Sequence, residues 1–174
     1  EPAAIGDEKL EAVATWHAAR LQEDPNFRVI FWCRFRIEAE RLLAKLALRC
    51  ITKLLYGGQT EEERAEAISL LGPGCQDRAA AIVGTSKTGG LGLDLSGAST
   101  TVYVSNDFSF MVRQQSEARV LGPNQKLPCA YFDFVATGPK GERTVDHLVL
   151  KALRAKDELA GWGAARWAAE LREE

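Results

Sequence analysis

A glycine-rich turn that follows an apolar segment has the composition of a ligand-binding loop. Segment 79–83 is apolar, and four glycines follow it within nine residues, at positions 84, 89, 90 and 92. Glycine lets the backbone approach a ligand closely or adopt positive φ. The turn also carries polar and charged groups, on Thr85, Ser86, Lys87, Thr88 and Asp94. Such a turn could bind a ligand or could simply be a tight connection after a strand, and the turn alone leaves both interpretations open.

The spacing of two of these glycines is the same as in a phosphate-binding P-loop. Gly84 and Gly89 are separated by four residues, as that motif requires. However, Gly90 and Leu91 stand where the motif needs Lys followed by Ser or Thr. The ammonium group that reaches the phosphates and the hydroxyl that binds magnesium are both missing, so this turn is not a P-loop.

Two arginines follow a second apolar segment. Segment 28–33 reads as a strand buried on both faces, and Arg34 and Arg36 come directly after it, where a helix is expected to begin. The dipole of a helix does not favour cations at its N-terminus. The two arginines therefore mark either a solvated helix start or a contact with an anionic partner.

The histidines and cysteines give no catalytic pair and no metal site. We expect His17 at a surface or interface and His147 on a helix surface, and no nucleophile lies beside a base. This argues against a small α/β enzyme with its own active site. The four cysteines are scattered without a Cys-x-x-Cys pair, which argues against zinc and favours reduced thiols.

The elements that must position these residues alternate along the chain. The expected strands are 28–33, 49–56, 79–83, 100–104 and 128–136, the last at a sheet edge because it contains a proline. The expected helices are 9–21, 37–48, 60–71, one that begins after Asp107 and Ser109, and 144–160. Thr60 and Glu63 have the spacing of a capping box. This order predicts an α/β fold, a three-layer sandwich with a mainly parallel central sheet.

In such a sheet, ligands bind beyond the carboxyl ends of the strands. We therefore expect the glycine-rich turn, Arg34 and Arg36 to share one edge.

The C-terminal part is expected to form two pieces. In helix 144–160, the residues expected to face inward are Val145, Leu148, Val149 and Leu153. Gly161 and a second glycine at 163 are expected to interrupt the chain before a last amphipathic piece. This divides the chain into a domain over 1–160 and a helical extension over 161–174.

Composition limits the class of protein. The 174 residues are 46% hydrophobic, enough for one well-packed core. A net charge of −2 argues against a generally basic nucleic-acid-binding protein but permits a local basic face. No apolar run is long enough to span a membrane, and no signal-peptide pattern is present. We expect a cytoplasmic protein of a bacterium or phage-infected cell, or a nuclear one in a eukaryote.

Six segments in order carry a resemblance to a known family. They are EKL (8–10), VIFWCRFRIEAERL (29–42), LYGGQTEEERAEAI (55–68), TSKTGGLGLDLSGAS (85–99), VYVSNDFSFMVRQQSEAR (102–119) and TVDHLVLKALRAK (144–156). Together they resemble the lead-in helix and motif IV through the closing helix of the C-terminal RecA-like lobe of superfamily 2 helicases. The resemblance is to the Swi/Snf-type DNA translocases and their phage relatives in particular.

The resemblance implies a RecA-like fold of the P-loop NTPase type that lacks its own P-loop. It implies ATP and Mg²⁺ as cofactors, both held mainly by an absent N-terminal lobe. It also implies DNA as a partner, double-stranded rather than single-stranded DNA or RNA. A degenerate RecA-like module that binds nucleic acid or acts as a scaffold without ATPase activity is the alternative.

The resemblance also assigns residues to roles. It implies that Arg119 is catalytic and that Asp94 contacts the nucleotide ribose. The implied ATP-binding residues are Gly90, Gly92, Asp94, Gln115 and Arg119. The implied nucleic-acid-binding residues are Arg34, Arg36, Thr85, Ser86 and Lys87.

The chain departs from the family at motif VI. Arg119 keeps the first arginine of the motif, but Gly122 occupies the place of the second and Asn124 replaces a glycine. In related phosphoryl-transfer enzymes an arginine finger contributes about 10³- to 10⁵-fold in rate. Arg113 precedes Arg119 by about a turn and a half and is a candidate for compensation.

Overall fold

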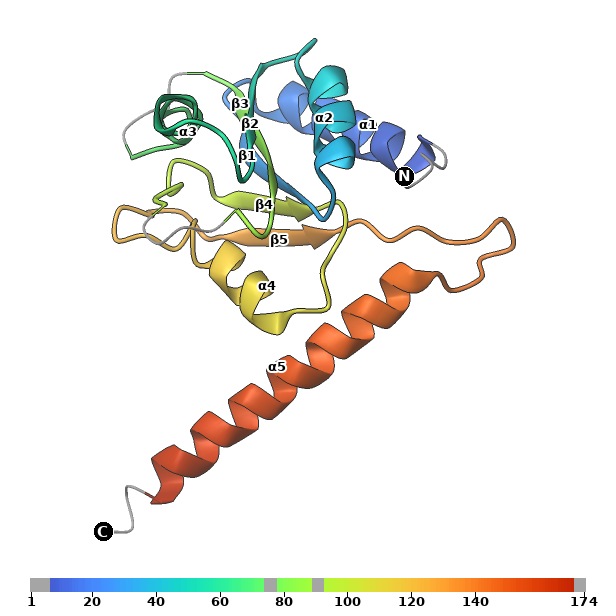
Figure 1. Cartoon of the computed structure of the whole chain (residues 1–174), viewed down its shortest axis with the longest axis vertical. Coiled ribbons are helices and arrows are strands. Elements are labelled where there is room, and N and C mark those ends of the chain that lie inside the picture. The colour runs from blue at the N-terminus through green and yellow to red at the C-terminus, as the bar shows by residue number, and fades with distance from the viewer. Residues whose placement is uncertain (1–6, 74–77, 89–92, 171–174) are drawn as a thin grey trace.

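The computed structural model describes residues 7–73, 78–88 and 93–170, with side chains as far as residue 161. Its centre is one five-stranded parallel sheet with helices on both faces (Figure 1). The strands are β1 (Arg28–Cys33), β2 (Ile51–Leu55), β3 (Ala80–Thr85), β4 (Thr100–Tyr103) and β5 (Ala130–Asp133). They lie in the order β2-β3-β1-β4-β5, and every neighbouring pair is parallel. The predicted three-layer α/β sandwich is confirmed, and β5 lies at an edge as expected.

The two faces of the sheet have separate cores. Helices α1 (Glu8–Glu23) and α2 (Arg36–Leu46) cover one face, where Val13 and Leu42 pack against Phe31 of β1. Helix α3 (Glu61–Ser69) covers the other, where Leu71 packs with Trp32. Helix α4 (Phe110–Glu117) lies on that second face. All six residues of β1 are buried because both of its faces are covered.

Two of the local signals that begin helices behave as predicted. The Thr60 hydroxyl accepts a hydrogen bond from the backbone N–H of Glu63, and the Glu63 carboxylate accepts one from the N–H of Thr60. This is the expected capping box. At α4, the Ser109 hydroxyl accepts a hydrogen bond from the N–H of Val112.

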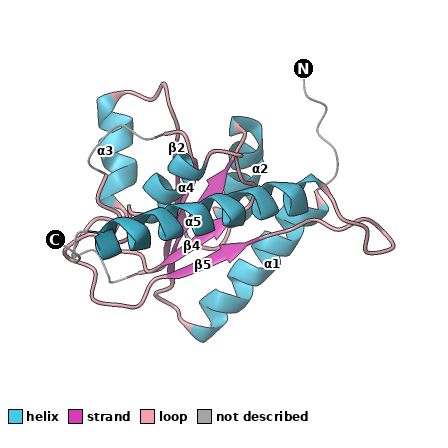
Figure 2. Ribbon diagram, turned by 90° about the horizontal axis from the view of Figure 1, so that it is seen from below, coloured by secondary structure: helices cyan, strands magenta, loops and turns pink. Residues whose placement is uncertain are grey.

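The last helix, α5 (Val145–Glu170), contradicts two expectations. It lies below α4 and extends beyond the rest of the molecule in Figure 1, and in Figure 2, which is seen from below, it passes in front of the sheet. Val149 and Leu153 are buried as predicted, but Val145 and Leu148 are 60% and 61% exposed, because α5 meets the body along one side only. The helix also continues through Gly161. One glycine inside a helix costs about 1 kcal/mol relative to alanine, which need not end it.

His17 is in the core and not at the surface, which corrects a further expectation. Its ring lies 5.6 Å from that of Phe31 and 6.1 Å from that of Phe27. Burial, and secondly the charge of Arg49, lower the pKa of His17 to about 4. The position continues the buried stripe of α1 formed by Leu10, Val13 and Ala14, so helical spacing alone could have revealed it.

Candidate nucleotide and nucleic-acid site

Three strands end side by side at the carboxyl edge of the sheet. In the register, Cys33 lies beside Thr85, and Trp32 lies beside Tyr103. The loops that follow are hydrogen-bonded to one another: Ser86 N donates to Cys33 O (3.3 Å), and Arg34 N donates to Ser105 Oγ (2.7 Å). The shared edge expected from the sequence is therefore confirmed.

The first glycine of the glycine-rich turn serves packing. A Cβ at Gly84 would lie 2.8 Å from both the carbonyl oxygen of Leu55 and the ring of Trp32. Glycine is therefore needed at this position to fit β3 against its neighbours. The other three glycines of the turn, including the predicted ATP-binding Gly90 and Gly92, lie outside the described residues.

The described part of this turn is closed by its own hydroxyls. The side chains of Thr85 and Thr88 share a hydrogen bond, and Thr88 N donates to Thr85 O (2.8 Å). Thr88 is buried, whereas Ser86 is half-buried and Lys87 is exposed. Of the predicted contact residues here, Ser86 and Lys87 are accessible, and Thr85 has its hydroxyl engaged within the turn.

The cations at the edge fall into two groups. Lys87 Nζ lies 3.1 Å from Oδ2 of Asp107, and Arg34 Nε lies 4.0 Å from the same oxygen. Arg36 is separate: it pairs with Glu40 (2.7 Å) and its guanidinium lies 4.0 Å above the ring of Tyr56. The structure thus brings Arg34 and Lys87 together but leaves Arg36 with other partners.

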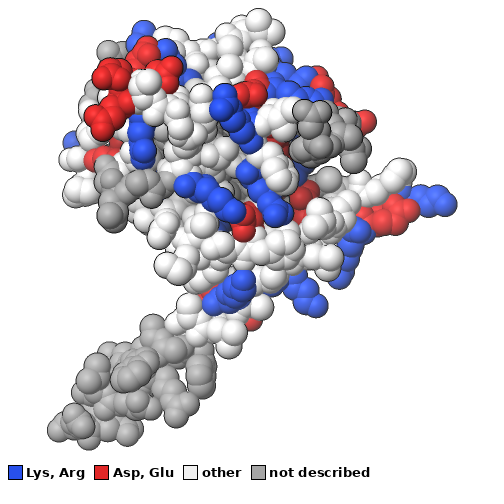
Figure 3. Space-filling view, viewed as in Figure 1, with Lys and Arg blue, Asp and Glu red and all other residues white. Residues whose placement is uncertain are grey.

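Charge is unevenly distributed over the face seen in Figure 3. Acidic side chains gather over α3, whose first turn contains Glu61, Glu62 and Glu63, while lysines and arginines form several smaller patches. The basic groups are therefore local, in agreement with the net charge of −2.

Asp94 is held in a short polar loop beside the segment of Arg119. Its carboxylate accepts hydrogen bonds from Ser96 N (2.9 Å) and from the Asn124 side chain (3.4 Å). The hydrogen bonds from Ser96, followed by that from Asn124, lower the pKa of Asp94, with burial opposing them. Leu95 N donates to the carbonyl of Arg119 (3.0 Å), so two residues predicted to share a nucleotide site are on adjoining backbone.

Gln125 positions this loop and was not singled out from the sequence. Its Nε2 lies within hydrogen-bonding distance of the carbonyls of Ser96 (3.2 Å), Ala98 (2.8 Å) and Val120 (3.0 Å). It therefore joins the loop after Asp94 to the segment after α4. In the motif VI pattern a glutamine follows the glycine that Asn124 replaces, and Gln125 matches it, so the motif could have identified this residue.

Arg119 has a different environment from the other arginines of the edge. It is half-buried, and its side chain makes no hydrogen bond or ion pair with any other described residue. Burial, and secondly the positive charge of Arg64, lower the pKa of Arg119. A half-buried cation without an anion is unfavourable, so this arrangement favours an anionic ligand. Gln115, assigned to the same site, is exposed on α4.

Gly122 stands where motif VI has its second arginine, and it packs closely against the loop of Asp94. A Cβ at Gly122 would lie 3.0 Å from Oδ1 of Asp94 and 3.3 Å from Cβ of Ser96. A side chain at this position would require the side chain of Asp94 or Ser96 to move by a few tenths of an ångström. The departure from motif VI is therefore part of how the loop packs.

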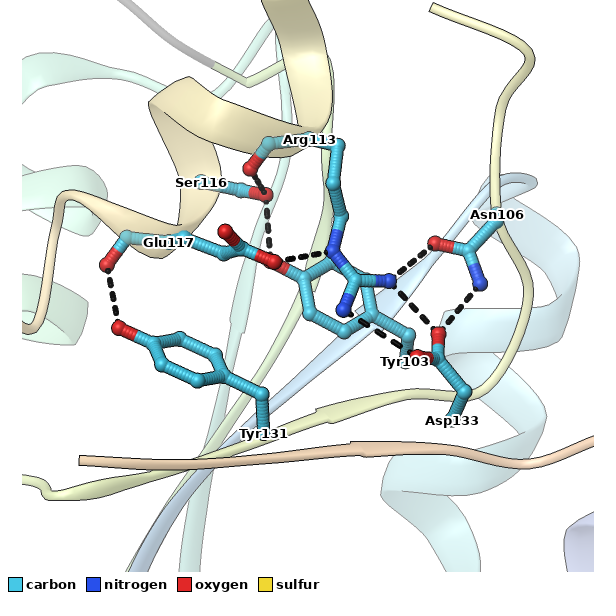
Figure 4. Close-up of polar contacts among 7 residues, drawn as sticks. All are labelled: Tyr103, Asn106, Arg113, Ser116, Glu117, Tyr131 and Asp133. Atoms are coloured by element: carbon cyan, nitrogen blue, oxygen red, sulfur yellow. Dashed lines mark hydrogen bonds and ion pairs between the residues drawn. The ribbon is translucent and has the colours of Figure 1, made fainter. Parts of the chain in front are cut away.

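Arg113 cannot replace that arginine, because it is committed elsewhere (Figure 4). Its guanidinium lies 3.4 Å above the ring of Tyr103 and donates to both carboxylate oxygens of Asp133 (2.6 and 3.2 Å). It also donates to Glu117 and to Asn106. Only 13% of the side chain is exposed. Arg113 joins α4 to β5 and is a structural residue.

Among the described residues, no group of three or more His, Cys, Asp or Glu could hold a metal ion. Within the same residues, no helix is long and apolar enough to cross a membrane.

Comparison with known proteins gives a partial sequence match. No protein-family model matches the chain. The chain is 35% identical over 67 residues to the DNA repair and recombination protein RDH54 of Saccharomyces cerevisiae. The match covers 38% of this chain and 7% of RDH54, so the chain spans a small part of that relative.

Two solved structures have the same fold over most of the chain. The C-terminal part of the Fun30 ATPase domain matches with a TM-score of 0.67 and 15% identity, covering 83% of this chain and 44% of that one. Domain 2 of the DEAD-box helicase Mss116p, bound to an RNA duplex, matches with a TM-score of 0.60 and 13% identity, covering 73% and 50%. Together with the motifs, these comparisons show that the chain has a RecA-like fold and is similar to the C-terminal lobes of superfamily 2 helicases of the Swi/Snf type.

Proposed function

We propose that the chain is the second motor lobe of an ATP-dependent DNA helicase or translocase. It completes an ATP site whose P-loop and magnesium-binding acids belong to an N-terminal RecA-like lobe. The observation that carries this proposal is Arg119, half-buried without an anion among the described residues and linked through its carbonyl to the Asp94 loop.

The nucleotide site follows from this arrangement. Asp94 is kept ionised by its hydrogen bonds and can accept from the ribose hydroxyls. Arg119 supplies positive charge to the γ-phosphate in the transition state, where an arginine is worth about 10³- to 10⁵-fold in rate. Gln115, Gly90 and Gly92 complete the lobe's share of the site.

The nucleic-acid contact lies at the same edge of the sheet. Arg34, Arg36 and Lys87 are exposed cations there, and Ser86 adds a hydroxyl. Such groups contact phosphates without reading the base sequence, and the resulting binding weakens with salt. RDH54 is named as a DNA repair and recombination protein, which supports DNA as the nucleic acid. Because Mss116p domain 2 is bound to an RNA duplex, RNA is the alternative that the experiment below must compare with DNA.

A second function is a RecA-like module that binds nucleic acid without hydrolysis. The observation that favours it is Gly122, which leaves motif VI with one arginine and is packed against Asp94. This module would keep the cations of the sheet edge but would not stabilise the transition state.

ATP hydrolysis separates the two functions. We would measure it for this lobe joined to its P-loop-bearing lobe, without nucleic acid, with duplex DNA and with duplex RNA, in the wild type and in Arg119→Ala. Arg20→Ala, on the opposite face of the sheet and paired with Glu23, is the matched control. DNA-stimulated turnover that Arg119→Ala abolishes supports the motor. DNA binding without any turnover supports the second function, and turnover by the 174-residue chain alone contradicts both.

A further inference from the structure

One carboxylate lies among the cations assigned to nucleic acid. Asp107 is in the loop that follows β4, and this loop reaches across the end of β1 towards the loop that follows β3. Its Oδ2 is 3.1 Å from Nζ of Lys87 and 4.0 Å from Nε of Arg34. The Asp107 side chain is only 15% exposed, whereas those of Lys87 and Arg34 are 69% and 38% exposed. The acid therefore lies beneath two cations that face solvent.

The two oxygens of this carboxylate have separate uses. Oδ1 accepts a hydrogen bond from Ser109 N (3.1 Å) and so shapes the turn before α4. Oδ2 faces Lys87 and Arg34. Burial tends to raise the pKa of Asp107, but Lys87, Ser109 and Arg34 together lower it, so the group is charged when the cations are present.

A phosphate oxygen that approaches these cations would meet this charge. Distances of 3 to 4 Å between cation and oxygen are those of an ion pair, so Oδ2 occupies the place that a phosphate oxygen would take. A second acid is close by, because Glu38 accepts a hydrogen bond from the hydroxyl of Ser105, which in turn accepts from Arg34 N. The cations of this edge are therefore partly neutralised from within the lobe.

We propose that Asp107 is an internal counter-ion that competes with nucleic-acid phosphates for Lys87 and Arg34, and so sets the affinity and salt dependence of the lobe for nucleic acid. This rests on the proposed nucleic-acid contact at the sheet edge. A lobe that translocates must release each phosphate it grips, and an acid held against the same cations favours release.

The test is binding of a fluorescein-labelled DNA duplex to the 174-residue chain over a range of salt concentrations. Asp107→Asn removes the charge and keeps an acceptor for Ser109 N. We expect it to bind about two- to fivefold more tightly at low salt, the range for an exposed ion pair. We also expect a steeper dependence of affinity on salt, because one more cation is free to release counterions.

Asp24→Asn is the matched control. Asp24 makes the same turn, with Oδ1 accepting from Asn26 N (2.9 Å), but precedes β1 at the amino edge. Its neutralisation should leave DNA binding unchanged. Asp107→Ser, whose hydroxyl can also accept from Ser109 N, gives a second neutral variant, and thermal melting checks that both variants fold.

The outcomes distinguish this inference from the function on which it rests. If Lys87→Ala weakens binding while both neutral variants of Asp107 bind no better than the wild type, Asp107 orients Lys87 and the inference is wrong. Equal tightening by Asp24→Asn would also overturn it, because net charge would then explain the effect. If Lys87→Ala and Arg34→Ala both leave binding unchanged, the proposed nucleic-acid face itself fails.

Discussion

Arg113 and Arg119 belong to the same short segment, but their side chains have different surroundings. The Arg113 guanidinium is hydrogen-bonded to several polar groups, whereas the Arg119 side chain makes no hydrogen bond or ion pair with another described residue. Arg113 is paired with Asp133, Glu117 and Asn106 over the ring of Tyr103. The pKa of Arg119 is lowered by burial and then by the positive charge of Arg64. An arginine that is paired with acids inside the protein has a structural role, whereas a half-buried arginine without an acidic partner can bind an anionic ligand. The environment of the side chain, and not its motif position alone, assigns the role.

The largest expected effect is on catalysis. In the two-lobe protein, Arg119→Ala should lower the rate of ATP hydrolysis by about 10³- to 10⁵-fold. The melting temperature of the 174-residue chain should stay the same or rise, because no described partner is lost. Arg119→Lys keeps the charge but loses the planar fork, and should recover only part of the rate. A marked loss of stability in Arg119→Ala would show that the comparison with Arg113 is wrong.

The opposite result is expected at Arg113. Removing it leaves Asp133 and Glu117 without their cation, so Arg113→Ala should lower the free energy of unfolding by about 3 kcal/mol. Chemical denaturation measures this loss. Arg20→Ala, which breaks an exposed pair with Glu23, should cost less than about 1 kcal/mol. Equal losses in the two variants would contradict the structural role of Arg113.

His17 is a third basic side chain away from solvent, and unlike an arginine it can lose its proton and be buried in the neutral form. The pKa of His17 is about 4 in the folded chain and 6.5 ordinarily, so between these values the unfolded chain binds more protons. Stability should therefore fall as the pH drops from 6.5 to 4, by up to about 3 kcal/mol. Because carboxylates also titrate near the lower limit, the measurement is the difference in unfolding free energy between the wild type and His17→Leu. A difference that does not change with pH would contradict the burial of a neutral His17.

The smallest expected effect tests whether motif VI can be repaired. Gly122→Arg restores the second arginine in sequence, but its Cβ would press on Asp94. We expect about 1–3 kcal/mol of destabilisation, the usual cost of overpacking, and no increase in ATP hydrolysis. A faster enzyme would show that the loop accommodates the arginine and that Gly122 limits the motor.

Features fixed by neighbouring residues could be predicted from the sequence. The apolar run 28–33 has the bounds of β1, and the capping box at Thr60 needs only residues within one helical turn. The resemblance also assigned Asp94 and Arg119 to one nucleotide site, and the structure places their segments beside each other. The exposed side of α5 could not be predicted, because it depends on how much of the helix other elements reach. Nor could Asp107, whose role arises from cations on two other loops.

The central place of β1 in the sheet also bears on how the chain folds. Its two neighbours, β3 and β4, come later in the sequence than α2, β2 and α3. The strand at the middle of the sheet therefore stays unpaired until a long stretch of chain has been synthesised and has closed back on it. Such non-local parallel pairing is slow, and until it forms the apolar strand RVIFWC is open to contacts with other chains.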